Sequence, residues 1–101
     1  MSKELVKSTK KKVSIQVKKP NFFKVILVND DFTTMEFVVK VLLLFFKMTK
    51  FKANSIVIKI HTEGSATCGL YPKDVAETLK NMVNNYSQQN EFPLKCLVRI
   101  N

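Results

Sequence analysis

The first strongly apolar run of the chain, residues 22–28, constrains the fold more than any other segment, because a core must be built around it. The run is aromatic and aliphatic, with Lys24 as its only charge. This composition is typical of a strand that is buried on both faces or nearly so. Asn29, Asp30 and Asp31 follow, and their short polar side chains favour a turn because they bond to nearby backbone. We therefore expect a buried strand that ends in a polar turn.

A helix is predicted directly after this turn, over about residues 34–47. Thr33 and Glu36 have the spacing of a capping box, in which each side chain bonds to the backbone N–H of the other residue. The apolar residues of this helix are unusually dense: Met35, Phe37, Val38, Val39, Val41, Leu42, Leu43, Leu44, Phe45 and Phe46. A helix that is apolar on almost every side is either central in a core or presents a face to a partner.

The rest of the chain predicts two further helices and two further strands. Thr49 can cap a helix over about residues 50–62, and Gly64 can end it. A short strand is expected over residues 66–71, a helix over residues 72–89 that starts at Pro72, and a last strand over residues 94–100. One stripe of the third helix is apolar: Val75, Ala76, Leu79, Met82, Val83 and Tyr86. The pattern predicts an α+β fold of order β-α-α-β-α-β, with three helices on one face of a small, mainly antiparallel three-stranded sheet.

The N-terminal residues 1–19 differ in composition from the rest of the chain. They contain seven lysines and one glutamate, so they hold six of the nine net positive charges. Their few bulky apolar residues cannot offset the entropy lost on ordering. We expect a flexible, lysine-rich N-terminal extension, although residues 13–17 alternate as a short edge strand would. Residues 20–101 are expected to form one domain, because the chain is too short for two.

The sequence predicts a cytoplasmic protein that does not cross a membrane. Residues 1–19 lack the apolar run of a signal peptide. The longest apolar stretch, residues 37–46, is interrupted by Lys40 and has about half the length of a membrane span. Nothing in the sequence suggests export, so Cys68 and Cys96 are expected to be reduced and buried.

No catalytic or metal-binding pattern is present. His61 is the only histidine, and Cys68 lies in an apolar strand, where thiols are inert. These two residues and Cys96 lack the spacing of a zinc site. Asp30 and Asp31 could form an acid and base pair, but adjacent side chains on a turn usually point apart. The sequence therefore predicts a binding protein that is not an enzyme and that needs no metal or cofactor.

The most specific segment is residues 23–39, FKVILVNDDFTTMEFVV. It resembles the ClpS family, whose signature is a strand that ends in Asn-Asp-Asp, followed by aromatic-Thr-x-Met-Glu-Phe-Val. The resemblance covers about residues 21–98 and continues in order through Ala53, His61 and Gly64, then Cys68-Gly69, then residues 75–78, and then Glu91, Pro93, Leu94 and Cys96. Motifs that occur in order through a whole domain are far more specific than one short motif.

The resemblance implies an adaptor that binds destabilising N-terminal residues, namely Phe, Tyr, Trp and Leu, and carries no cofactor. It implies delivery of the bound protein to a AAA+ unfoldase of the ClpA type, which feeds the ClpP protease. The implied partners are the N-terminal domain of that unfoldase and N-degron peptides and proteins, with no role for membrane or nucleic acid. Asp74 and Leu79 correspond to the docking face, and the free protein is expected to be a monomer.

The resemblance also implies where the substrate binds. Asn29 and His61 would contact the N-terminal ammonium, and Asp30 and Asp31 would supply charge and further hydrogen bonds. An ammonium has three donors, and charge-assisted bonds are roughly twice as strong as neutral ones. The pocket for the first side chain corresponds to Leu27, Val28, Thr33, Met35, Val38, Val57, Ile60 and Leu94. Val57 stands where the family usually has methionine, so the preference among the four side chains is expected to shift.

Other interpretations of the same residues stay open at this point. Taken singly, residues 29–31 are an ordinary turn, Met35 and Val38 are core residues, and His61 is a surface or capping group. The alternative function is a small basic RNA-binding or ribosome-associated domain that uses its lysines to neutralise phosphates. Against it, the chain has one arginine, Arg99, and no predicted aromatic platform for bases. A third alternative is an interaction module that uses the apolar first helix.

Overall fold

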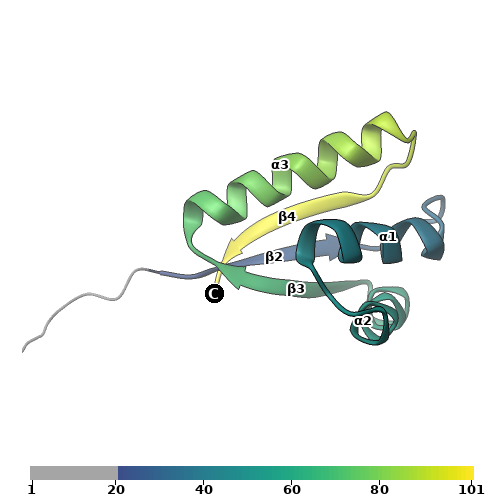
Figure 1. Cartoon of the computed structure of the whole chain (residues 1–101), viewed down its shortest axis with the longest axis horizontal. Coiled ribbons are helices and arrows are strands. Elements are labelled where there is room, and N and C mark those ends of the chain that lie inside the picture. The colour runs from purple at the N-terminus through teal and green to yellow at the C-terminus, as the bar shows by residue number, and fades with distance from the viewer. Residues whose placement is uncertain (1–20) are drawn as a thin grey trace, which may run out of the picture.

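A computed structural model describes residues 21–101 of the chain, so the predicted N-terminal extension and the alternating segment 13–17 lie outside the described residues. The elements are β2 (Phe23–Val28), α1 (Met35–Phe46), α2 (Lys50–Glu63), β3 (Ser65–Tyr71), α3 (Lys73–Gln89) and β4 (Lys95–Ile100). Their order confirms the predicted β-α-α-β-α-β arrangement (Figure 1). None of the three described helices is long and apolar enough to span a bilayer.

The sheet has the order β3-β2-β4, with β2 in the middle and both pairs antiparallel. Val28, at the end of β2, pairs with Ser65 at the start of β3 and with Lys95 at the start of β4. Antiparallel pairing therefore places the end of β2 between the starts of its two neighbours. The turn after β2 consequently lies beside the end of α2 and beside the segment that leads into β4.

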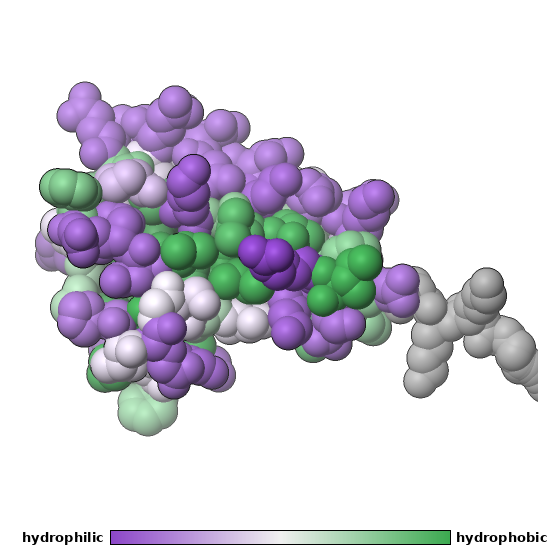
Figure 2. Space-filling view, turned by 180° about the vertical axis from the view of Figure 1, so that it is seen from behind, coloured by the Kyte–Doolittle hydropathy of each residue, from purple (hydrophilic) through white to green (hydrophobic). Residues whose placement is uncertain are grey.

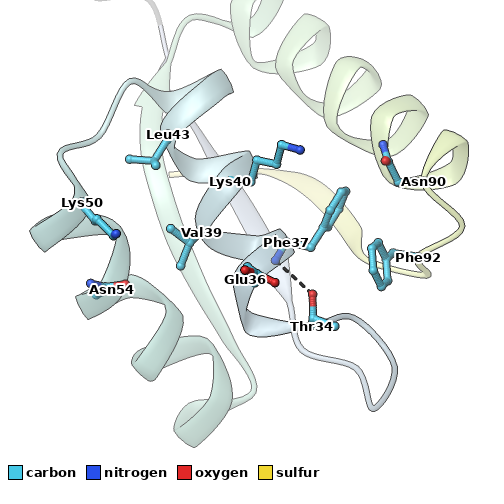
Figure 3. A pocket seen from close by; sticks show the side chains of 10 residues that line it. All are labelled: Thr34, Glu36, Phe37, Val39, Lys40, Leu43, Lys50, Asn54, Asn90 and Phe92. Carbon is cyan, nitrogen blue, oxygen red and sulfur yellow. Dashed lines mark hydrogen bonds between the residues drawn. The ribbon is translucent and has the colours of Figure 1, made fainter.

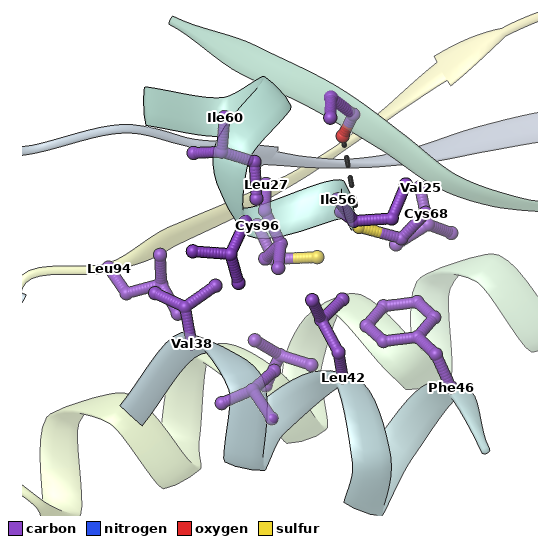
Figure 4. Close-up of a cluster of buried hydrophobic side chains, with 14 of the residues drawn as sticks. Val25, Leu27, Val38, Leu42, Phe46, Ile56, Ile60, Cys68, Leu94 and Cys96 are labelled. Atoms are coloured by element: carbon purple, nitrogen blue, oxygen red, sulfur yellow. Dashed lines mark hydrogen bonds between the residues drawn. The ribbon is translucent and has the colours of Figure 1, made fainter. Parts of the chain in front are cut away.

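The core lies between the sheet and the helices that cover one of its faces (Figure 1). Val25 and Leu27 of β2 are fully buried and lie on this covered face. Figure 4 shows Val38, Leu42 and Phe46 of α1 facing these sheet residues. Removing such a set of side chains from water is the main stabilising contribution to a domain of this size.

The first strand was expected to be buried on both faces or nearly so, but only one of its faces is fully buried. Val25 and Leu27 are buried, whereas Lys24, Ile26 and Val28 between them are only partly buried. The reason is that the helices cover a single face, so alternate residues of β2 point to the other one. Figure 2 views the molecule from that side, where hydrophobic residues gather in the middle and hydrophilic residues surround them.

The capping box predicted for the first helix is also wrong. Thr34 is the N-cap of α1, and its hydroxyl oxygen accepts a hydrogen bond from the backbone N–H of Phe37 at 3.1 Å. The Thr33 side chain is instead directed toward Asp30, because both its N–H and its hydroxyl donate to that carboxylate. The caps of the second helix are confirmed, with Thr49 at its start and Gly64 at its end.

The apolar stripe of the third helix is only partly buried. Ala76 and Val83 are fully buried, but Val75 and Met82 are each 45% exposed, contrary to the expected stripe. The predicted stripe is wider than the face of α3 that the sheet covers, so its edges remain in water. Ser87 is buried instead, and its hydroxyl donates to the carbonyl of Val83 at 2.8 Å.

Both cysteines are free and buried in the core, as expected. Burial raises the pKa of the Cys68 thiol to about 12, and the nearby Cys96 adds to the increase. Burial likewise raises the pKa of the Cys96 thiol to about 12. Both side chains are therefore protonated at neutral pH, which makes them poor nucleophiles.

Candidate functional site

The candidate site forms where the turn after β2 meets the end of α2. The backbone N–H of Asn29 donates to the carbonyl of Gly64 at 2.9 Å, one residue beyond the pairing of Val28 with Ser65. Gly64 ends α2 with a φ of 92°, a left-handed conformation that glycine adopts without steric penalty. The last turn of α2, which carries His61, is thereby held against the turn that carries Asn29.

A cavity of about 250 Å³ lies between this turn, the first turns of α1 and the last turns of α2. Nine of the predicted site residues line it: Asn29, Asp30, Asp31, Thr33, Met35, Val38, Val57, Ile60 and His61. They come from three separate segments of the chain. The structure therefore brings together the polar and the apolar groups that the sequence analysis assigned to one site.

Three predicted pocket residues do not line this cavity. Val28 and Leu94 line an adjoining space of about 10 Å³, which shares Asn29, Asp30, Thr33, Val38 and Ile60 with the main cavity. Leu94 is 4% exposed and precedes β4, so it closes the bottom of the site. Leu27 is fully buried in the core and lines none of the described cavities.

The Asp30 carboxylate organises the turn. Its Oδ1 accepts from the backbone N–H of Phe32 at 2.8 Å and from that of Thr33 at 2.7 Å, and its Oδ2 accepts from the Thr33 hydroxyl at 2.7 Å. Burial alone would raise the pKa of Asp30, but these bonds from Thr33 and Phe32 outweigh it and lower the pKa. Asp30 is therefore a carboxylate that already accepts three hydrogen bonds and holds the turn in shape.

The other polar groups of the site remain available to a ligand. Asn29, Asp31 and His61 are exposed, and within residues 21–101 no side-chain hydrogen bond engages them. An amide oxygen, a carboxylate and a neutral ring nitrogen can all accept hydrogen bonds. The walls behind them are formed by the buried apolar side chains of Val38, Val57 and Ile60. The arrangement suits a ligand with a cationic donor group next to an apolar side chain.

Comparison with known proteins agrees with this geometry. The model of the family described as "ATP-dependent Clp protease adaptor protein ClpS" matches residues 18–97. The chain belongs to the ClpS family. It is 49% identical over 84 residues to the ClpS adapter of Alkalilimnicola ehrlichii, covering 83% of this chain and 79% of that one. It is 52% identical over 81 residues to the ClpS adapter of Methylococcus capsulatus, covering 80% and 76%.

A solved ClpS structure also shares the fold. Agrobacterium tumefaciens ClpS2 bound to L-phenylalaninamide superimposes with a TM-score of 0.80 at 31% identity, covering 82% of this chain and 100% of that one. The ClpS family is one of adaptors, which agrees with the expectation that the chain is not an enzyme. Residues 21–101 contain no group of three or more His, Cys, Asp and Glu side chains that could hold a metal ion.

A second, larger concavity surrounds α1 in this ClpS-family chain. It measures about 720 Å³ and is open to solvent. Figure 3 shows that its lining falls on two sides of α1, with Val39 and Leu43 facing α2 while Phe37 and Phe92 lie toward α3. Its other lining residues are mostly polar or charged and exposed: Thr34, Glu36, Lys40, Lys50, Asn54 and Asn90. Its acceptors Asn54 and Asn90 lie on opposite sides of α1, whereas those of the smaller cavity converge, so the smaller cavity is the stronger candidate.

The two residues that are predicted to dock to an unfoldase differ in exposure. Asp74 is exposed in the first turn of α3. Leu79 is partly buried and packs against the core. The exposed apolar residues of this helix are Val75 and Met82, which belong to the predicted apolar stripe. Helical periodicity alone could not show where the covered face of α3 ends.

Proposed function

We propose that this protein captures proteins with Phe, Tyr, Trp or Leu at the N-terminus and delivers them to the AAA+ unfoldase of a Clp protease. The observation that carries the proposal is the cavity of about 250 Å³, whose walls are apolar and whose rim holds Asn29, Asp31 and His61. A free N-terminal residue offers both matching parts, an ammonium and a side chain. The bound L-phenylalaninamide of the related ClpS2 is a ligand of this chemical kind.

The ammonium would be bound at the rim. Asn29 and His61 accept its hydrogen bonds. Asp31 supplies a carboxylate with which no described side chain forms a hydrogen bond. Asp30 adds negative charge but acts mainly by holding the turn, because Phe32 and Thr33 already donate to it. Such a site rejects an acetylated N-terminus, because acetylation removes the charge and leaves the acceptors of the rim without a partner in the complex.

The first side chain would be bound inside the cavity. Val38, Val57 and Ile60 form its buried walls, and Leu94 closes the bottom. Burying a Phe or Leu side chain contributes about 1.5–3 kcal/mol. Met35 lies at the edge with 53% of its surface exposed, where its side chain can crowd first residues that branch at Cβ. Thr33 completes the lining beside Asp30.

Delivery requires a second surface. We place it on α3, around exposed Asp74, with Leu79 and its exposed neighbours Val75 and Met82 adding apolar contact. The partner would be the N-terminal domain of a ClpA-type unfoldase, bound by a monomer of this chain. In this proposal residues 20–101 are the adaptor domain, and the lysine-rich residues 1–19 are an extension that assists hand-off.

The test is titration with a fluorescent peptide that starts with Phe, compared with its acetylated twin. Only the free peptide is expected to bind. His61→Ala, and Asp30→Ala combined with Asp31→Ala, should abolish binding. Thr62→Ala is the matched control, because Thr62 is exposed next to His61 and lines none of the described cavities. Equal affinity for the two peptides would refute the capture of an ammonium.

A further inference from the structure

A groove lies next to the candidate pocket, on the other side of the turn after β2. It measures about 440 Å³ and is lined by Val28, Asn29, Asp30, Asp31, Phe32, Pro93 and Lys95. The three turn residues 29–31 also line the pocket. The groove and the pocket are therefore neighbouring hollows that share one wall.

Phe32 is the most unusual residue of this groove. Its side chain is 78% exposed, although a large aromatic side chain in water is unfavourable. Its backbone is held in place, because its N–H donates to the Asp30 carboxylate at 2.8 Å. The aromatic ring is consequently presented from a fixed turn, next to exposed Pro93. An exposed aromatic side chain on a fixed backbone is a low-entropy contact for a partner.

We infer that this groove binds the substrate residues that directly follow the captured N-terminal residue. The inference rests on the proposed function, since it concerns the same bound chain. The pocket encloses one side chain, so the rest of the substrate must leave across the rim, and residues 29–31 form the side of that rim that the groove adjoins. An extended residue spans about 3.3–3.6 Å, and the ends of a tight turn lie within about 7 Å, so two residues suffice to cross it. The second or third residue then packs an apolar side chain against Phe32 and Pro93.

The charges along this path define the preferred sequence further. Asp31 is exposed on the shared turn, so it disfavours an acidic residue at the second position. Lys95 is exposed in the groove wall, where it starts β4 opposite Val28. The Lys95 ammonium favours an acidic residue after the apolar one. The groove thus selects a segment that is uncharged or basic first, then apolar, then acidic.

Calorimetric titration of the full chain with two probes tests the inference. One probe is L-phenylalaninamide, which reaches only the pocket, and the other is a peptide that begins Phe-Ala-Leu-Asp. Phe32→Ala is expected to lower the affinity for the peptide about fivefold and to leave the affinity for L-phenylalaninamide unchanged. Phe51→Ala is the matched control, because Phe51 is 87% exposed on α2 and lines none of the described cavities. It should change neither affinity.

A charge reversal provides the second arm. Lys95→Glu should lower the affinity for the peptide Phe-Ala-Leu-Asp and raise the affinity for Phe-Ala-Leu-Lys. If Phe32→Ala lowers the affinity for both probes equally, the substitution acts through the turn and not through the groove. If it lowers neither affinity, the substrate does not use the groove. Either result overturns the inference. If L-phenylalaninamide fails to bind the unaltered protein, the proposed function itself fails. Circular dichroism of Phe32→Ala should be unchanged, since the ring is 78% exposed.

Discussion

The backbone N–H of Asn29 donates to the carbonyl of Gly64 across 2.9 Å. This bond continues the pairing of β2 with β3 by one residue, into the turn that carries the acceptors of the site. It also reaches the residue that ends α2, only three positions after His61. Two segments far apart in sequence therefore share one rim, and the site depends on this junction.

Gly64→Ala should destabilise the protein by about 1–2 kcal/mol, because Gly64 has a φ of 92° that an L side chain rarely adopts. A Cβ at this position would meet nothing within 4 Å, so the effect is conformational and not steric. Urea unfolding measures it. Gly64→Asn is the control and should lose less stability than Gly64→Ala, since asparagine tolerates this conformation. Equal losses in the two variants would contradict this explanation.

Asn84→Ala should destabilise the protein by about 1–3 kcal/mol. The Asn84 side chain accepts from the N–H of Cys96 at 2.9 Å and donates to its carbonyl at 3.2 Å, which fastens α3 to β4. Removing it leaves both backbone groups without these partners. Asn85→Ala is the matched control, because Asn85 is exposed and makes no such bond within the described residues. Thermal unfolding that shows the same midpoint for both variants would refute the role of Asn84.

The stability that Asp30 contributes should depend on acid pH. The hydrogen bonds from Thr33 and Phe32 lower its pKa below the ordinary 3.8, so the contribution is complete above that pH. It is lost as the pH falls through the lowered pKa of the folded state. In urea unfolding, Asp30→Asn should be less stable than the unaltered protein at pH 7, and the difference should shrink below pH 3.8. A difference that is independent of pH would contradict the assignment.

Val57→Met should change the selectivity of the pocket. Val57 is 5% exposed and lines the cavity of about 250 Å³, so a longer side chain there takes space from the ligand. One methylene group corresponds to about 0.8 kcal/mol, so the affinity for Trp relative to Leu should fall about fourfold. Titration with peptides that start with Phe, Tyr, Trp and Leu measures the ranking. An unaltered ranking would show that Val57 does not shape the pocket.

Most of the fold could be predicted from residues 20–101. The bounds of all six elements could be predicted to within about two residues. They follow from the apolar runs and from the signals that separate them, which are the turn at residues 29–31, Gly64 and Pro72. These signals are local, so they can be recognised without any knowledge of the packing. The family resemblance added the site residues, whose separate roles remain predictions.

Other features depended on contacts between distant segments. Thr33 could not be told from Thr34 as the cap of α1, because the choice depends on the bonds that Asp30 makes in the folded turn. The exposure of Val75 and Met82 depends on how much of α3 the sheet covers. The groove beside Phe32 exists because the segment before β4 passes next to the end of β2. Periodicity specifies which residues can be buried, whereas the pairing of strands determines which surfaces meet.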